Sequence, residues 1–166
     1  MSDIRLIGIE SIRIGPSLDT LATIQYIVPD SAHLVLNAAS VSDLFCDDFE
    51  YPDVQLIAGG KKTIEFATRD MGTTMMINAF GGAASGVSIW KSPHTAISIT
   101  ERAFEITSKL INDKQLKFEI ARASLHAGGE LRFAKTESGQ ITFTADVLLP
   151  PTTANAPIKM TILPLT

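Results

Sequence analysis

Five acidic side chains form the densest group of potential metal ligands in the chain: Asp43, Asp47, Asp48, Glu50 and Asp53. Carboxylate oxygens are the ligands that Ca²⁺ and Mg²⁺ prefer. The spacing does not match an EF-hand loop, and the central glycine of that loop is missing. We therefore expect an acidic loop that faces solvent or a partner, and no metal site.

Histidine and cysteine give no stronger signal. His33, His94 and His126 are scattered, and none lies three or four residues from another histidine or from Cys46, as a zinc motif requires. Cys46 precedes two aspartates, whose negative charges disfavour the reactive thiolate. We expect these side chains to be structural or solvent-facing.

Two further patterns also lack the context that catalysis needs. The glycine-rich stretch 81–86 follows a predicted helix instead of opening one, so it is not a phosphate loop. Ser124 and His126 lie close in sequence but show no nucleophile elbow. Trp90 could be an exposed recognition anchor, but a lone tryptophan more often closes a core or a subunit interface. The sequence predicts no enzyme and no cofactor.

The elements that must position these residues are mostly β-strands. Apolar and polar residues alternate over seven segments, which is typical of antiparallel sheets with one face on a core. These segments are 8–14, 62–66, 95–100, 101–107, 115–122, 130–134 and 140–149. Turns are predicted at 112–114 and 137–139, and a glycine turn or bulge at 127–129. We expect an antiparallel β-sandwich or small barrel.

One short helix is predicted over 70–80, flanking the sheets. Asp70 or Thr68 is a candidate N-cap, and Gly81 is a candidate left-handed C-terminal residue. The apolar stripe expected to pack on the core consists of Met71, Met75, Met76, Ala79 and Phe80.

The segment Ser40–Gly60 is too long for an ordinary connection. We expect an extended hairpin or an arm that this domain or a neighbouring subunit covers. The candidate contact residues are Leu44, Phe45, Phe49, Tyr51, Val54, Leu56 and Ile57, together with Trp90. Beyond Pro150, a C-terminal extension could add an edge strand over 157–165.

Length and composition fit a single domain over 1–166. The chain is 45% hydrophobic and only 19% charged. Such a low charged fraction suits either a subunit that buries surface in an assembly or a protein whose surface simply carries few charges. A net charge of −4 argues against binding nucleic acid through its phosphates. One cysteine permits no internal disulfide, and neither a signal peptide nor a membrane span is expected.

The order of parts resembles the tail tube proteins of tailed bacteriophages. It comprises the opening strand GIESIRIGP (8–16), the acidic aromatic loop 45–53, a strand, one helix ending in Gly81-Gly82, Trp90 and long antiparallel strands. The resemblance implies a β-sandwich or small barrel with one helix, six copies forming a ring, and stacked rings forming a tube through which DNA leaves the capsid. Type VI secretion and contractile injection tubes share this fold.

The resemblance also implies partners and a location. The partners would be further copies of the chain and other tail proteins (terminator, baseplate or tape measure), with DNA passing unbound and no membrane. The location would be the virion tail, assembled in the host bacterial cytoplasm. Polar strand faces at 115–119 or 140–146 could line the lumen. Two alternatives remain: another ring component of a tail or injection device, or an isolated β-sandwich binding module that uses Trp90 or the acidic loop.

Overall fold

The protein is mainly β, with antiparallel sheets and one short helix, as expected from the sequence. The computed structural model describes residues 8–44, 54–94, 100–109, 114–130, 139–151 and 156–164. The elements are β1 (Ile9–Gly15), β2 (Ala22–Thr23), β3 (His33–Leu36), β4 (Ser40–Leu44), β5 (Val54–Ala58), β6 (Lys62–Thr68), α1 (Thr73–Phe80), β7 (Ala83–Ala84), β8 (Trp90–Lys91), β9 (Thr100–Ser108), β10 (Lys114–Glu130), β11 (Gln140–Val147) and β12 (Ile158–Pro164).

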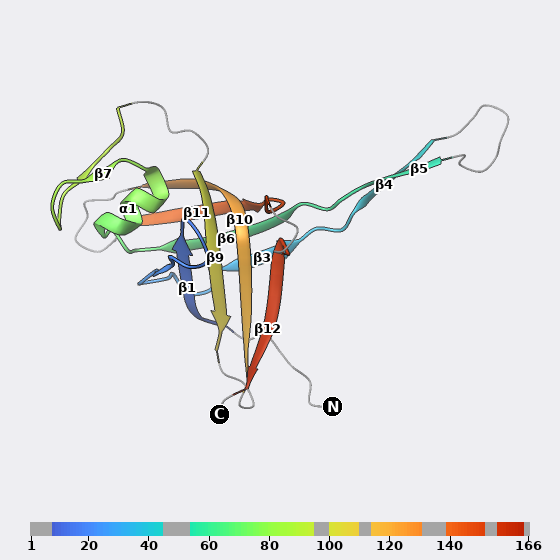
Figure 1. Cartoon of the computed structure of the whole chain (residues 1–166), viewed down its shortest axis with the longest axis horizontal. Helices are drawn as coiled ribbons and strands as arrows, with labels where there is room; N and C mark the ends of the chain where they lie inside the picture. The colour runs from blue at the N-terminus through green and yellow to red at the C-terminus, as the bar shows by residue number, and fades with distance from the viewer. Residues whose placement is uncertain are drawn as a thin grey trace.

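The main sheet has eight strands in the order β2-β1-β9-β10-β11-β6-β3, with β12 added beside β10. Strand β10 joins the two parts of this sheet, because two strands, β12 and β11, pair with different halves of the same edge. β12 pairs with Lys114–Ile120, and β11 pairs with Ala123–Glu130. A register shift against β9 separates these halves of β10. Figure 1 shows β10 bending there, so that β1, β9 and β12 run across β6 and β11.

The core lies where this bent sheet faces itself. Phe66 on β6 stacks on Phe143 of the adjacent β11, with ring centroids 4.7 Å apart. Phe66 also meets the edge of Phe104 on β9, at 6.2 Å, although β6 and β9 are not neighbours in the sheet. The fold is therefore two layers of one curled sheet, and this sheet does not close into a barrel.

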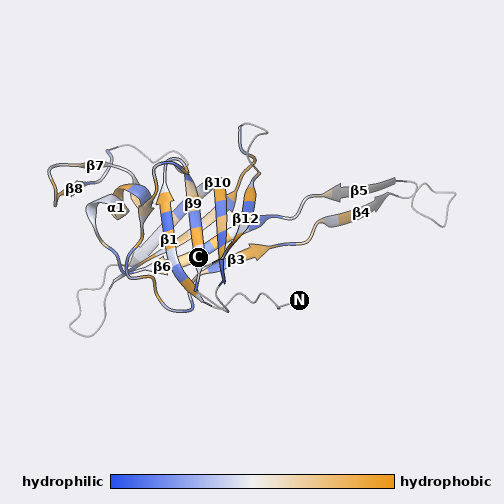
Figure 2. Ribbon diagram, turned by 60° about the horizontal axis from the view of Figure 1, so that its bottom comes forward, coloured by the Kyte–Doolittle hydropathy of each residue, from blue (hydrophilic) through white to orange (hydrophobic). Residues whose placement is uncertain are grey.

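The alternation that predicted the strands is visible along β1, β9, β10 and β12 in Figure 2. Ile12, Phe104, Ile120 and Phe143 are all fully buried on the inner face. Most residues of the expected strands over 95–100 and 130–134, and of the expected turns at 112–114 and 137–139, lie outside the described residues. The expected C-terminal edge strand is present as β12.

One short segment partly closes the open side of the curled sheet. Residues 22–28, here called the crossing segment, begin beside β1, where the Ile24 amide donates to the Ile12 carbonyl at 2.9 Å. They end beside β6, where the Val28 amide donates to the Ala67 carbonyl, also at 2.9 Å. The crossing segment thus bridges β1 and β6 at one end of the curled sheet. At the other end β1 and β3 lie apart. No sequence pattern predicts an element over these residues.

The glycine turn or bulge predicted at 127–129 is wrong, because the pairing of β10 with β11 runs through these residues without a register shift. β10 continues through it, with Gly128 opposite Thr142 and Gly129 opposite Ile141. A Cβ on Gly129 would lie 2.7 Å from the Gln140 carbonyl oxygen. That glycine therefore permits close approach of two strands instead of a reversal of the chain.

The end of the strand prediction over 140–149 also needs correction. β11 ends at Val147, and Leu149, at the end of the predicted strand, is 77% exposed. The Leu148 amide still donates to the Arg122 carbonyl in the register of the β10–β11 ladder, so the pairing extends one residue past β11.

The helix begins later than predicted. Its N-cap is Gly72, which makes no side-chain cap, and Asp70 accepts from the Gly72 amide at 2.9 Å. Neither Asp70 nor Thr68 caps the first turn, and Met71, 36% exposed, precedes the helix. Of the expected stripe, Met75 and Ala79 are buried, and Met76 and Phe80 pack against the core. The expected positive φ at Gly81 is present, at 69°.

Candidate functional site

The most distinctive surface is a two-stranded hairpin that stands clear of the domain. β4 and β5 pair antiparallel from Ser40 opposite Ala58 to Leu44 opposite Val54. In both Figure 1 and Figure 2 this pair, here called the arm, projects away from the layered sheet. The extended-hairpin alternative for this segment is therefore confirmed.

The arm carries four of the eight candidate contact residues. In its register Leu44 lies opposite Val54, and Leu56 and Ile57 follow further along β5. Phe45, Phe49 and Tyr51 lie outside the described residues. An isolated hairpin is only marginally stable in water, so the arm is suited to a partner that covers it.

The base of the arm sets its direction. The Asn37 amide donates to the Lys61 carbonyl at 3.1 Å, which links the β3–β4 side of the ribbon to the β5–β6 side. A Cβ on Gly60 would lie 1.9 Å from the Asn37 carbonyl oxygen and 2.6 Å from that of Ala38. Residues 37–38 and 60–61 therefore pack closely against each other at the base. Because of this packing, β4 and β5 continue in the direction of β3 and β6.

Trp90 does not belong to the arm. Its indole Nε1 donates to the Gly81 carbonyl at 2.8 Å, and its ring lies 6.4 Å from that of Phe80. It therefore holds the β7–β8 hairpin against the end of α1, which lies opposite the arm in Figure 1. Trp90 is half-buried in this position, and it lines a small cavity with Phe80 and Met76.

A ladder of alternating charges crosses the outer face of β1, β9, β10 and β12. Glu105 accepts from Arg13 at 3.0 Å and from Lys117 at 3.2 Å. Glu119 lies 3.1 Å from Lys117 and 3.2 Å from Lys159. The hydrogen bond from Lys117 is the largest of the effects that lower the pKa of Glu119, and the same bond raises the pKa of Lys117. Paired charges make this face polar without making it strongly basic.

Within the described ranges, no three histidine, cysteine, aspartate or glutamate side chains lie close enough to hold a metal ion. His33, His94 and His126 are exposed and lie on separate parts of the fold. Cys46 and most of the acidic cluster lie outside the described residues. Ser124 is buried opposite Asp146 on β11, and His126, two residues further along β10, lies opposite Thr144.

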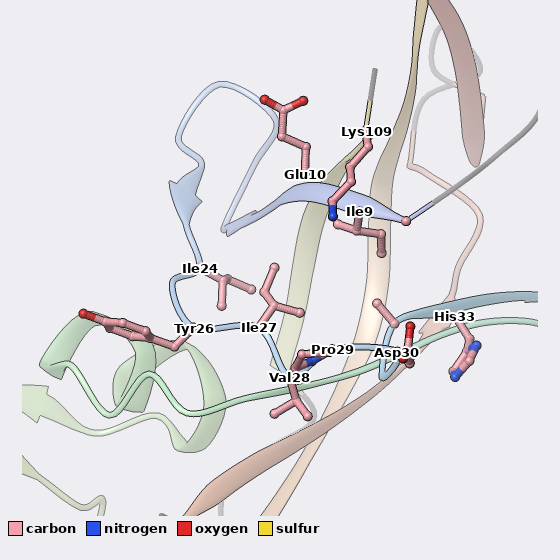
Figure 3. A pocket seen from close by; sticks show the side chains of 12 residues that line it. Ile9, Glu10, Ile24, Tyr26, Ile27, Val28, Pro29, Asp30, His33 and Lys109 are labelled. Atoms are coloured by element: carbon pink, nitrogen blue, oxygen red, sulfur yellow. The ribbon is translucent and has the colours of Figure 1, made fainter. Parts of the chain in front are cut away.

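A cavity that the sequence did not predict opens between β1 and β3. Its outer part, about 560 Å³, is lined by Glu10, Asp30 and Lys109 around apolar residues of the crossing segment. In Figure 3 the side chains of Ile9, Ile24 and Ile27 point into this space, whereas Glu10 points away.

An inner, mainly apolar part of about 300 Å³ reaches between the layers and is lined by Ile12, Leu34, Leu36, Ile64, Ile106 and Phe118, among others. The two parts share Gly8, Ile9, Ala32 and His33. We call them together the seam cavity. The cavity exists only because strands distant in sequence lie near each other in the fold, so no local sequence pattern could have predicted it.

The part of the chain that the structure describes contains one helix, and its eight residues are too few to cross a bilayer. Neither a protein-family model nor a curated protein sequence matches this chain.

Proposed function

We propose that this chain is the subunit of a hollow tube of the phage-tail type. In this proposal six copies form a ring, rings stack, and DNA passes through the lumen during ejection. The chain is then a structural protein rather than an enzyme, located in the virion tail, and its partners are other copies of itself and other tail proteins.

The observation that carries the proposal is the arm. A hairpin fixed at its base and directed away from its own domain, with Val41 56% exposed on β4, offers apolar surface that a neighbouring subunit can cover. A contact between an arm and a different surface of the next copy is heterologous, and heterologous contacts produce closed rings or open filaments. The mainly-β, two-layered fold with one flanking helix is also what the resemblance to tail tube proteins implies.

The charge ladder supports a role for the outer sheet face as a lumen wall. Lys117 and Glu119 lie in the segment 115–119 that the sequence offered as a lumen candidate. Because the basic groups of the ladder are paired with carboxylates, they offer little to hold DNA phosphates. DNA would slide past such a face rather than bind to it.

Negative-stain electron microscopy of the purified protein tests the proposal. The expected result is rings or tubes with a central channel. Single rings that never stack would favour the alternative, a ring component such as a terminator or baseplate protein. A protein that stays monomeric at high concentration under all conditions would refute both.

A further inference from the structure

The seam cavity is bordered by two strands that have room for another. In the described chain, β3 pairs along only one edge, with β6. On the other side of the cavity, β1 pairs with β9 along one edge. Among the described residues, β2 and the Ile24 amide cover the other edge of β1 only from Ile12 onward, which leaves its first residues open on that edge. Strand edges of this kind accept an added strand from another chain.

The seam cavity is open to solvent, with charged side chains in its outer part and a mainly apolar inner part. At the mouth of the inner part Leu36, at the end of β3, is 62% exposed. On the opposite wall Phe118 is half-buried, and its cross-strand partner Met160 is 56% exposed. A mainly apolar recess with exposed apolar side chains near its mouth is typical of a site that a protein segment fills.

We propose that the seam cavity of one copy receives the arm of a second copy. The base of the arm holds it in line with β3 and β6, so the arm leads away from the cavity of its own chain. An arm strand places apolar residues at alternate positions, as Val54 and Leu56 show, which suits insertion with one face turned into the cavity. This inference rests on the proposed assembly and names the surface that receives the arm.

The charges of the chain are divided in a way that favours contact between an arm and the body of another copy. The chain has 14 basic and 18 acidic residues, and the stretch 40–60 holds five of the acids and none of the bases. The remainder therefore carries 14 basic against 13 acidic residues. Arms repel one another and are expected to contact the nearly neutral body of another copy instead. The seam cavity itself is lined by both signs of charge, with Lys109 together with Glu10, Asp30 and Glu65. Its open strand edges, rather than its charge, therefore suit it to receive the arm.

Two variants separate the arm from the cavity. In the armless variant, Asn-Gly replaces residues 41–57 and forms a two-residue turn between Ser40 and Ala58, which face each other. In the cavity variant, Leu36→Glu places a carboxylate at the mouth. Its control is Leu149→Glu, the same change at another exposed leucine outside the seam cavity.

Sedimentation velocity of each protein and of mixtures gives the answer. We expect the armless variant and Leu36→Glu each to remain monomeric at concentrations on the order of 100-fold above those at which the original chain assembles, since inserting the arm would bury an unpaired charge. Leu149→Glu should assemble like the original chain. An equimolar mixture of the armless variant with Leu36→Glu should form a dimer that stops there, because the pair has one arm and one open cavity.

The outcomes that overturn the inference differ from those that overturn the proposed function. If the original chain assembles and the armless variant does not, but Leu36→Glu assembles normally, the proposed function stands and the cavity is not the receptor. If the mixture stays monomeric, the arm and the cavity are not complementary, and the inference fails. If the original chain is itself monomeric, both fail.

Discussion

Replacing Gly60 by alanine should disturb the arm while leaving the domain folded. The added Cβ would lie 1.9 Å from the Asn37 carbonyl oxygen, whereas such contacts are essentially never below 3.0 Å. The two sides of the base must therefore separate by about 1 Å or more, and overpacking of this kind costs about 1–3 kcal/mol. Alanine recovers about 0.4–1 kcal/mol by restricting the unfolded chain. We expect a net loss of about 1–2 kcal/mol.

Gly59→Ala is the matched control, because a Cβ at Gly59 has nothing within 4 Å. Urea unfolding followed by circular dichroism measures the free energy of unfolding of both variants, and sedimentation velocity measures their assembly. Gly60→Ala should be the less stable variant and should need about 5- to 30-fold more protein to assemble, since about 1.4 kcal/mol corresponds to a factor of ten. If the two variants unfold and assemble alike, the close packing at the base does not direct the arm.

Two further predictions concern the domain itself. Phe66→Leu and Phe104→Leu should show a coupling free energy of about 0.5–1.5 kcal/mol in a double-mutant cycle of urea unfolding, because the two rings meet across the layers; strictly additive losses would mean that β6 and β9 do not face each other. Glu119→Gln should lower stability at pH 7 by less than about 1 kcal/mol, since the carboxylate is partly exposed. Because the folded-state pKa of Glu119 is lowered from 4.5, this difference should be present above that pH and should vanish as the pH falls well below it. A difference that is the same at pH 3 and pH 7 would contradict the ion-pair account.

The strands were predictable because their alternation reflects burial on one face. Ile12, Phe104 and Phe143 are fully buried as the pattern requires, and a period of two survives almost any arrangement of strands in space. Predictions that relied on single residues failed more often. Gly129 lies within a strand because a neighbouring carbonyl approaches it, and composition cannot distinguish that requirement from a turn.

The candidate site was predictable only where it is local. The length and the apolar content of the stretch 40–60 predicted an extended hairpin or an arm. This prediction was possible because the pairing of a hairpin involves only its own residues. The seam cavity depends instead on where β1 and β3 lie relative to each other, and the crossing segment between them carries no recognised motif. Met71 was assigned to the core because it fits the helical spacing, but the helix starts after Gly72.

The pairing of β1 with β9 has a consequence for synthesis on the ribosome. Arg13 and Glu105, which form an ion pair across these strands, are 92 residues apart in sequence. At about 5–20 residues per second, translation leaves β1 without its partner for roughly 5–18 s. The β4–β5 hairpin needs only nearby residues and can form in microseconds once it emerges. A nascent chain can therefore form this hairpin before its body exists, and under the proposed assembly only a completed copy, whose seam cavity has formed, can receive it.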